Sequence, residues 1–288
     1  MTDTDREADL RYEHIDRAVK AATTLSYELK TLCTVDSSSA WTETYFRETN
    51  DDTTDGGTGS PIAGVPQYAP FPFFDVTETK VQSVIKKYAG ESIISLEAEQ
   101  NATLPMLQRK IFRLSRKIAY QVDSAIEAEI SSNAGNTLAI SAGNEWDSAT
   151  IANRDPVKDF LDAIQLLRAD GYDALKGKGY IVMNGTDYTN VISNSKVLNH
   201  PTYQSVSAVE NGQVARLVGL TIMVSETVTA DQAYVLVSKE ALTWKQASSL
   251  TVKTIEDPGK STTIRAWERG VPQMVAPNAA CKLTNTRA

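Results

Sequence analysis

The sequence has little of the two residue types that most often build active sites and metal centres. Among its 288 residues there are only two histidines and two cysteines. Cys33 and Cys281 lie at opposite ends of the chain, a spacing that fits neither a disulfide framework nor a paired-cysteine zinc site. Any Ser-His-Asp or Cys-His arrangement would have to use His14, in a charged N-terminal stretch, or His200, in a polar one. We therefore expect no catalytic residue, no metal site and no cofactor.

Long hydrophobic runs are also missing. The longest apolar runs, such as residues 218–224, are much shorter than the roughly 20 residues that a membrane-spanning helix needs. Residues 1–7 are acidic and lack the apolar stretch of a secretory signal. Gly259-Lys260-Ser261 resembles the end of a phosphate-binding loop, but Thr254 stands where that loop requires glycine. These absences argue against a membrane protein and against a nucleotide site.

Positive charge is in the minority. Lys and Arg total 29 against 36 Asp and Glu, which gives a formal net charge of −7 and a pI of about 5.0. A sequence-specific DNA-binding domain usually carries a basic excess, because its affinity comes largely from phosphate contacts that release counterions. The 41% hydrophobic content is typical of a globular chain. The composition favours a folded protein whose surface as a whole repels polyanions.

The first hundred residues combine a helical pattern with a long strand-rich segment. Apolar residues recur at three-to-four spacing over residues 5–33, which predicts an amphipathic helix. Residues 41–48 read as a strand, residues 50–61 as a Gly-rich loop, and residues 73–88 and 92–96 as further strands. A long hairpin of this kind cannot bury itself alone. It either folds back on the main body or projects and packs against another copy, and projection is the favoured interpretation.

Residues 103–131 predict the clearest element of the chain. Thr103 suits the N-cap and Pro105 the first turn, and Asn133 and Gly135 suit the end. A helix of about 27 residues is roughly 40 Å long. Its apolar positions follow one narrow stripe: Leu104, Leu107, Ile111, Leu114, Ile118, Val122, Ile126 and Ile130. One side of the helix therefore packs, and the other is exposed or meets a partner.

The charges of this helix are segregated. The acidic residues Asp123, Glu127 and Glu129 occupy the C-terminal half, which is the unfavourable end for anions in the helix dipole. One interpretation is an ordinary solvated face; the other is a contact with an acidic partner, such as a polyanion or the acidic groups of another chain. The cations of the N-terminal half form the candidate contact site: Arg109, Lys110, Arg113, Arg116 and Lys117.

The remainder alternates helices and strands in an α+β pattern. Asp155-Pro156 begins a helix that ends near Gly171, and Thr186 is expected to cap a short second helix. Residues 199–214 predict a polar loop, and Asp257–Lys260 a hairpin turn. Strands are expected at residues 180–183, 220–224, 233–237, 250–255, 262–267 and 271–275.

The order of these elements and several local motifs resemble one known family. The motifs are Lys87–Glu97 with Tyr-Ala-Gly-Glu, Trp146 followed by Asp155–Phe160 and Gly171–Ala174, Tyr180–Tyr188, Gly212–Ser225 and Glu268–Gln273. Together they are similar to the major capsid protein of tailed double-stranded DNA viruses, with the Hong Kong 97-type capsid fold. That fold has an N-terminal arm, an extended β-hairpin loop, a long spine helix, and peripheral and axial domains.

The resemblance implies a division of the chain. The arm would be residues 1–40, the extended loop 41–98, the peripheral domain 99–150 with its spine helix at 103–133, the axial domain 151–250, and the return strands to the peripheral domain 251–288. Only about forty residues precede the loop, whereas many relatives begin with a scaffold-like segment of about a hundred. A separate scaffold protein or a short arm is therefore expected.

The resemblance also implies a function: self-assembly of hexamers and pentamers into an icosahedral shell around viral DNA. The expected partners are other copies of the chain, portal and scaffold proteins, weakly and non-specifically bound double-stranded DNA, and a cement or decoration protein, with no membrane. The expected location is the virion, after assembly in the host cytoplasm, and no enzymatic activity is expected. The alternatives are an encapsulin-like nanocompartment shell that encloses cargo enzymes, and an unrecognised α+β enzyme.

Overall fold

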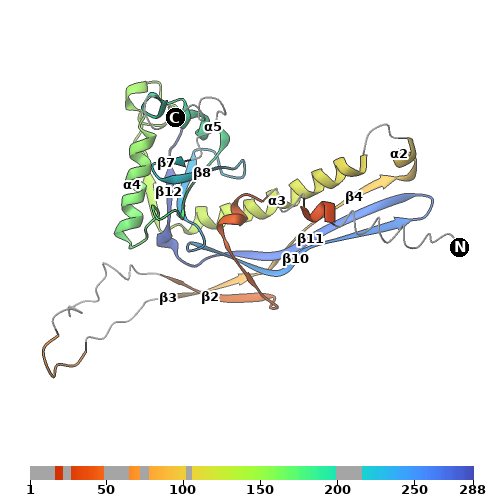
Figure 1. Cartoon of the computed structure of the whole chain (residues 1–288), viewed down its shortest axis with the longest axis horizontal. Helices are drawn as coiled ribbons and strands as arrows, with labels where there is room; N and C mark the ends of the chain where they lie inside the picture. The colour runs from red at the N-terminus through yellow and green to blue at the C-terminus, as the bar shows by residue number, and fades with distance from the viewer. Residues whose placement is uncertain (1–16, 22–26, 49–64, 72–77, 102–105, 199–215) are drawn as a thin grey trace.

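The protein is built around one long helix, α3 (Met106–Asn133). The helix lies across a four-stranded sheet, and its C-terminal half packs against a second, six-stranded sheet (Figure 1). This computed structural model describes residues 17–21, 27–48, 65–71, 78–101, 106–198 and 216–288. The fold is α+β, as the sequence predicts, and α3 coincides with the predicted spine helix.

The predicted apolar stripe of α3 is confirmed over the described part of the helix. Ile111, Leu114 and Ile118 are buried against the four-stranded sheet. Further along, Val122, Ile126 and Ile130 are buried in the main core of the second sheet. The helix therefore joins two cores through one face. The predicted N-cap Thr103 and first-turn Pro105 lie outside the described residues.

The four-stranded sheet has the order β1-β10-β11-β4. α3 covers one face, together with Val19 of a helical segment at residues 17–21. The turn predicted at Asp257–Lys260 joins β10 to β11, with a hydrogen bond of 3.0 Å from the Lys260 amide to the Asp257 carbonyl. The strands are β1 (Thr34–Ser37), β4 (Lys86–Ser95), β10 (Leu242–Asp257) and β11 (Ser261–Met274).

Three strand predictions in this sheet were too short. The strands predicted at residues 262–267 and 271–275 are one strand, β11, and the strand at 250–255 is part of the longer β10. Between the two predicted segments lies Gly270, where an added Cβ would come within 2.5 Å of the Trp244 ring. The glycine thus permits close packing inside a continuous strand and does not end it. Likewise, residues 92–96 are the end of β4 and the first residue of α2 (Leu96–Asn101).

A separate two-stranded hairpin is formed by β2 (Thr42–Glu48) and β3 (Glu78–Val84), which confirms the strand predicted at residues 41–48. Of the chain that joins these strands, the structure describes residues 65–71, which lie far from the body in Figure 1. Tyr68 and Phe71 within this segment are almost completely exposed. The Gly-rich loop predicted at residues 50–61 lies outside the described residues.

The helix predicted over residues 5–33 does not extend to its expected end. Residues 17–21 are helical, but Tyr27 and Glu28 are not, and Leu29–Leu32 form a 3-10 turn, η1. The apolar spacing reflects burial at Leu29 and Leu32 in the main core, without a continuous helix. Residues 1–16 and 22–26 lie outside the described part of the chain.

The six-stranded sheet has the order β5-β12-β9-β6-β8-β7. α4 packs on it through Phe160, Ala163 and Leu167, and Trp146 lies 5.3 Å from the Phe160 ring. The cap expected at Thr186 is instead Asn184, whose side chain accepts the Thr186 amide at 3.0 Å. The strands are β5 (Asn136–Ala139), β6 (Gly179–Met183), β7 (Arg216–Leu217), β8 (Leu220–Val224), β9 (Gln232–Val237) and β12 (Ala280–Thr284). The helices are α4 (Pro156–Ala169), α5 (Gly185–Ile192) and α6 (Ser195–Leu198), with 3-10 turns η2 (Ile151–Asn153) and η3 (Pro277–Ala279).

Candidate functional site

The structure brings the predicted cations together on the outer side of α3. At about 3.6 residues per turn, the five positions fall within one third of the helix circumference, opposite the buried stripe. Four of the side chains are exposed, and Lys110 is half-buried because its ammonium group donates to the Ile93 carbonyl of β4. We call the four exposed residues the basic face: Arg109, Arg113, Arg116 and Lys117.

Two of the three acidic residues in the C-terminal half of α3, Asp123 and Glu127, are buried. Asp123 is only 2% exposed, and its carboxylate accepts the amides of Glu28 at 2.8 Å and of Lys30 at 3.0 Å. Burial raises the pKa of Asp123 to about 6. This carboxylate therefore fixes the turn η1 of the N-terminal segment to the middle of the long helix.

Glu127 makes a similar connection to the second sheet. Its carboxylate accepts hydrogen bonds from the Tyr234 hydroxyl at 2.8 Å and the Thr229 hydroxyl at 3.0 Å. Burial is the main cause that raises the pKa of Tyr234 above its ordinary value. A buried carboxylate is costly without such donors.

The N-terminal segment is also held from the sheet side. Glu268 of β11 is fully buried and accepts hydrogen bonds from the Tyr27 hydroxyl and the Lys30 ammonium group. Lys30 lies 4.4 Å from the centre of the Tyr27 ring and 5.3 Å from that of Trp244. Burial and the neighbouring Glu268 charge raise the pKa of Tyr27. We call Tyr27, Lys30, Asp123 and Glu268 the arm anchor.

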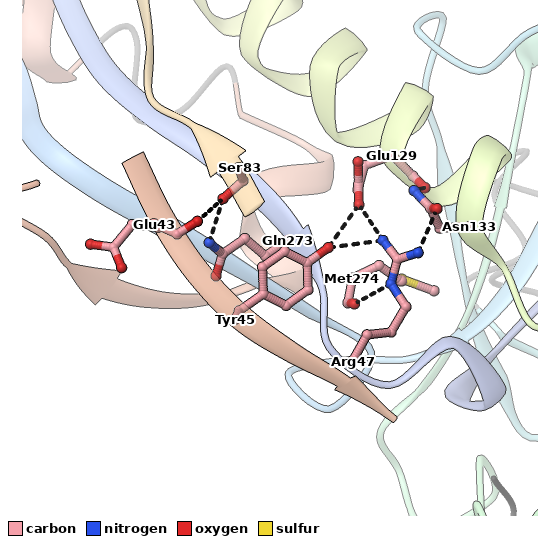
Figure 2. Close-up of polar contacts among 8 residues, drawn as sticks. All are labelled: Glu43, Tyr45, Arg47, Ser83, Glu129, Asn133, Gln273 and Met274. Atoms are coloured by element: carbon pink, nitrogen blue, oxygen red, sulfur yellow. Dashed lines mark hydrogen bonds and ion pairs between the residues drawn. The ribbon is translucent and has the colours of Figure 1, made fainter. Parts of the chain in front are cut away.

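A second polar cluster joins the β2–β3 hairpin to α3 and β11 (Figure 2). The Arg47 guanidinium donates to Asn133 at 2.9 Å, to Glu129 at 3.3 Å and to the Met274 carbonyl at 3.3 Å. It also donates to the Tyr45 hydroxyl at 2.9 Å. One planar side chain of the hairpin thus binds both the long helix and the sheet.

The other strand of the hairpin contributes Ser83, which accepts the Gln273 side chain at 2.7 Å. Next to these contacts lies an open groove of about 660 Å³ between β2, β3, α3 and β11. Further out, Glu48 accepts the Tyr172 hydroxyl at 2.5 Å. We call the contacts of Tyr45, Arg47, Ser83, Glu129, Asn133 and Gln273 the hairpin junction.

Sequence reasoning missed the arm anchor and the hairpin junction. Each combines residues that are far apart along the chain, such as Lys30 with Glu268 and Arg47 with Glu129. The available signal was weak: three carboxylates in the unfavourable half of a helix, which indicates that specific donors compensate them.

The described residues offer little chemistry beyond these contacts. They contain no group of three or more His, Cys, Asp and Glu side chains that could hold a metal ion. Both cysteines are free and buried, and burial raises the pKa of each thiol to about 12. His14 and His200 lie outside the described residues. Within the described part of the chain, no helix has the length and apolarity that crossing a membrane requires.

Comparison with known proteins gives one sequence match and many structural ones. The sequence model of a family described as phage capsid protein matches residues 78–283. No curated protein sequence matches the chain.

The structural matches are distant in sequence and extensive in coverage. The capsid of the cyanophage P-SCSP1u is 14% identical with a TM-score of 0.67, over 90% of this chain and 88% of that chain. The virus-like particle from Pyrococcus furiosus is 13% identical with a TM-score of 0.65, over 95% and 99%. The structure from Mycobacterium phage Che8 is 17% identical in sequence with a TM-score of 0.60, and the match covers 86% of each chain. These similarities establish the fold.

Proposed function

Because the chain belongs to the phage capsid protein family, we propose that it builds a closed icosahedral shell from hexamers and pentamers of itself, around a double-stranded DNA genome. The chain is a major capsid protein with the Hong Kong 97-type fold and a component of the virion. It assembles with other copies of itself. The observation that carries the shell architecture is the arrangement of hairpin, long helix and two sheets, which matches capsid structures over most of the chain.

Surfaces that one copy leaves uncovered support the assembly. Tyr68 and Phe71 are exposed to 104% and 91%, so almost none of their surface is covered. Exposed aromatic side chains of this kind favour a protein partner. A neighbouring copy in a shell supplies such a partner for every subunit.

The division into arm (1–40), extended loop (41–98), peripheral domain (99–150), axial domain (151–250) and return strands (251–288) is part of this proposal. Two strands refine it. β4 pairs with β11 along its whole length, which supports counting residues 86–95 with the peripheral sheet and not with the extended loop. β10 begins at Leu242 and runs past residue 250, which supports an axial domain that ends near Leu242.

We also propose a purely structural, non-enzymatic role, with portal and scaffold proteins and a decoration protein as further partners and assembly in the host cytoplasm. The buried thiols support the absence of nucleophilic chemistry, because a cysteine nucleophile needs an accessible thiolate. A nanocompartment shell with enclosed enzymes shares the fold but is less favoured, since the matching family is that of phage capsids.

Electron microscopy of the purified full-length protein tests the proposal. Closed shells tens of nanometres across are expected. A species that stays monomeric at every salt concentration and pH would overturn it. Shells from infected cells are expected to contain DNA, and shells that contain only an enzyme would support the nanocompartment instead.

A further inference from the structure

The basic face is a stretch of unbalanced positive charge in an otherwise acidic protein. From residue 100 to residue 122 the sequence contains five cations and no Asp or Glu. Arg109, Arg113 and Lys117 follow each other at four-residue spacing, so they form one row about 12 Å long, with Arg116 beside it. A row this long spans the axial distance of three to four phosphates of one DNA strand.

These cations have no acidic partner in the part of the chain that the structure describes. None of the ion pairs between described residues involves Arg109, Arg113, Arg116 or Lys117. Only Arg116 has a ring contact, with its guanidinium 5.5 Å from the centre of the Phe112 ring. Their charge is therefore available to an anion outside the subunit.

The opposite face of the four-stranded sheet differs in this respect. It also carries four cations: Lys87, Lys253, Arg265 and Arg269. However, Arg265 pairs with Glu91 at 2.9 Å. The other contacts are with tryptophans: Lys87 lies 5.6 Å from the Trp267 ring centre and Arg269 lies 4.6 Å from that of Trp41. Most cations of this face already have partners within the chain.

Two further features lie beside α3. The helical segment 17–21 packs on α3 through buried Val19, whose carbonyl accepts the Ser115 hydroxyl at 3.3 Å. Arg17 and Lys20 of this segment are exposed. Tyr120 lies on the same side of α3 and is 49% exposed, and its phenol can donate to a phosphate oxygen.

We propose that the basic face binds the phosphate backbone of double-stranded DNA without sequence preference, and that this side of α3 therefore lines the interior of the shell. The inference rests on the proposed capsid function and adds to it the contact surface and the orientation of the subunit. Four cations provide local attraction, while the net charge of −7 provides long-range repulsion. The combination keeps each contact weak, as a container that must fill and empty requires.

The test compares two variants of the full-length, unassembled protein. The first replaces the basic face: Arg109→Gln, Arg113→Gln, Arg116→Gln and Lys117→Gln. The matched control replaces the cations of the opposite sheet face: Lys87→Gln, Lys253→Gln, Arg265→Gln and Arg269→Gln. Each variant has a net charge lower by four, so a difference in DNA affinity between the two variants reflects the position of the replaced cations and not the total charge. The probe is a fluorescent 20-base-pair DNA duplex, titrated between 50 and 200 mM salt.

For the unsubstituted protein, log K is expected to fall with log salt with a slope of about −4, since each neutralised phosphate contributes about −0.9. The basic-face variant is expected to lose at least tenfold in affinity and most of this slope, whereas the control keeps its slope. Equal losses in both variants, or no salt dependence in the unsubstituted protein, would overturn the inference.

Two further measurements keep the test decisive. Arg109→Lys, Arg113→Lys and Arg116→Lys retain the charge and should retain the slope, even if the glutamine variant does not fold. Electron microscopy of the same variants separates the two proposals. A basic-face variant that binds the duplex normally but no longer assembles would assign the face to an acidic segment of a neighbouring subunit and overturn DNA binding. If the unsubstituted protein forms no shells, the capsid function fails while the DNA titration still gives its own result.

Discussion

At the scale of single residues, buried carboxylates with distant donors hold this protein together. Asp123, Glu127 and Glu268 are almost completely buried, and each accepts hydrogen bonds from segments at least 90 residues away in sequence. Removal of one hydrogen-bond partner lowers the free energy of unfolding by far more than the intact interaction adds to it, because a charge is left buried without a partner. These residues are therefore the most sensitive polar positions of the fold.

Asp123 makes the stability of the arm anchor depend on pH. Its pKa in the folded protein is about 6, above the ordinary value of 3.8, because burial disfavours the charged form. The folded state therefore binds the proton more tightly, and the stabilisation is complete below about pH 4 and is lost as pH rises through 6. The expected loss is about 3 kcal/mol between pH 4 and pH 7, since about two pKa units are involved.

Urea unfolding of the unassembled protein, followed by tryptophan fluorescence, measures this dependence. The unsubstituted protein is compared with Asp123→Asn. Burial also raises the pKa values of Asp159 and Asp187, but these two residues change the free energy of unfolding equally in both proteins. The difference between the two should contain the 3 kcal/mol change. A difference that stays constant with pH would contradict the assignment.

At the scale of elements, α3 contacts the N-terminal segment, both sheets and the β2–β3 hairpin. Its buried stripe enters two cores, its acidic half binds the N-terminal segment and the second sheet, and its last turns bind the hairpin through Glu129 and Asn133. The hairpin itself has only two strands, too few to be stable on its own. Its position consequently depends on the hairpin junction.

Arg47→Lys is expected to loosen the hairpin selectively. Lysine keeps the charge but cannot reach Glu129, Asn133 and the Met274 carbonyl together, which should cost about 1–2 kcal/mol. Amide hydrogen exchange should accelerate in Thr42–Glu48 and stay unchanged in Pro156–Ala169. The exposed Lys80→Gln on the paired strand serves as control. Uniform acceleration throughout the chain would show that Arg47 supports the whole fold and not the hairpin alone.

At the scale of the whole molecule, a subunit combines well-packed cores with aromatic side chains that nothing described covers. Tyr68 and Phe71 contribute nothing to the packing of one copy. The basic face likewise has no acidic partner among the described residues. We therefore expect these features to make their contacts in the assembly.

Tyr68→Ser together with Phe71→Ser should separate folding from assembly. The free energy of unfolding of the subunit should change by less than about 0.5 kcal/mol, as for other exposed sites. The yield of closed shells, counted by electron microscopy, should fall severalfold because the aromatic contacts with neighbouring copies are lost. Tyr68→Phe with Phe71→Tyr keeps the aromatic area and should assemble normally. Unchanged shell yield with the serine pair would exclude these side chains from the interface.

The sequence by itself determined the elements whose signal is local. The long helix, its buried stripe, the strand at residues 41–48 and the turn at Asp257–Lys260 follow from periodicity and turn chemistry within a few residues. The segregation of cations on α3 was equally visible, because it needs only the spacing of one helix. The order of the elements was sufficient to indicate the capsid family.

Only the tertiary structure decided what depends on distant contacts. It ended the N-terminal helix early, because Leu29 and Leu32 enter a core formed by residues far along the chain. It extended β11 through Gly270, because that residue pairs with β10 on one side and with β4 on the other. It also showed that Asp123 and Glu127 are buried and hydrogen-bonded to distant segments. Burial and hydrogen bonding between segments far apart in the sequence outweigh local propensity at these places, and the misplaced carboxylates of α3 were the one weak local sign of them.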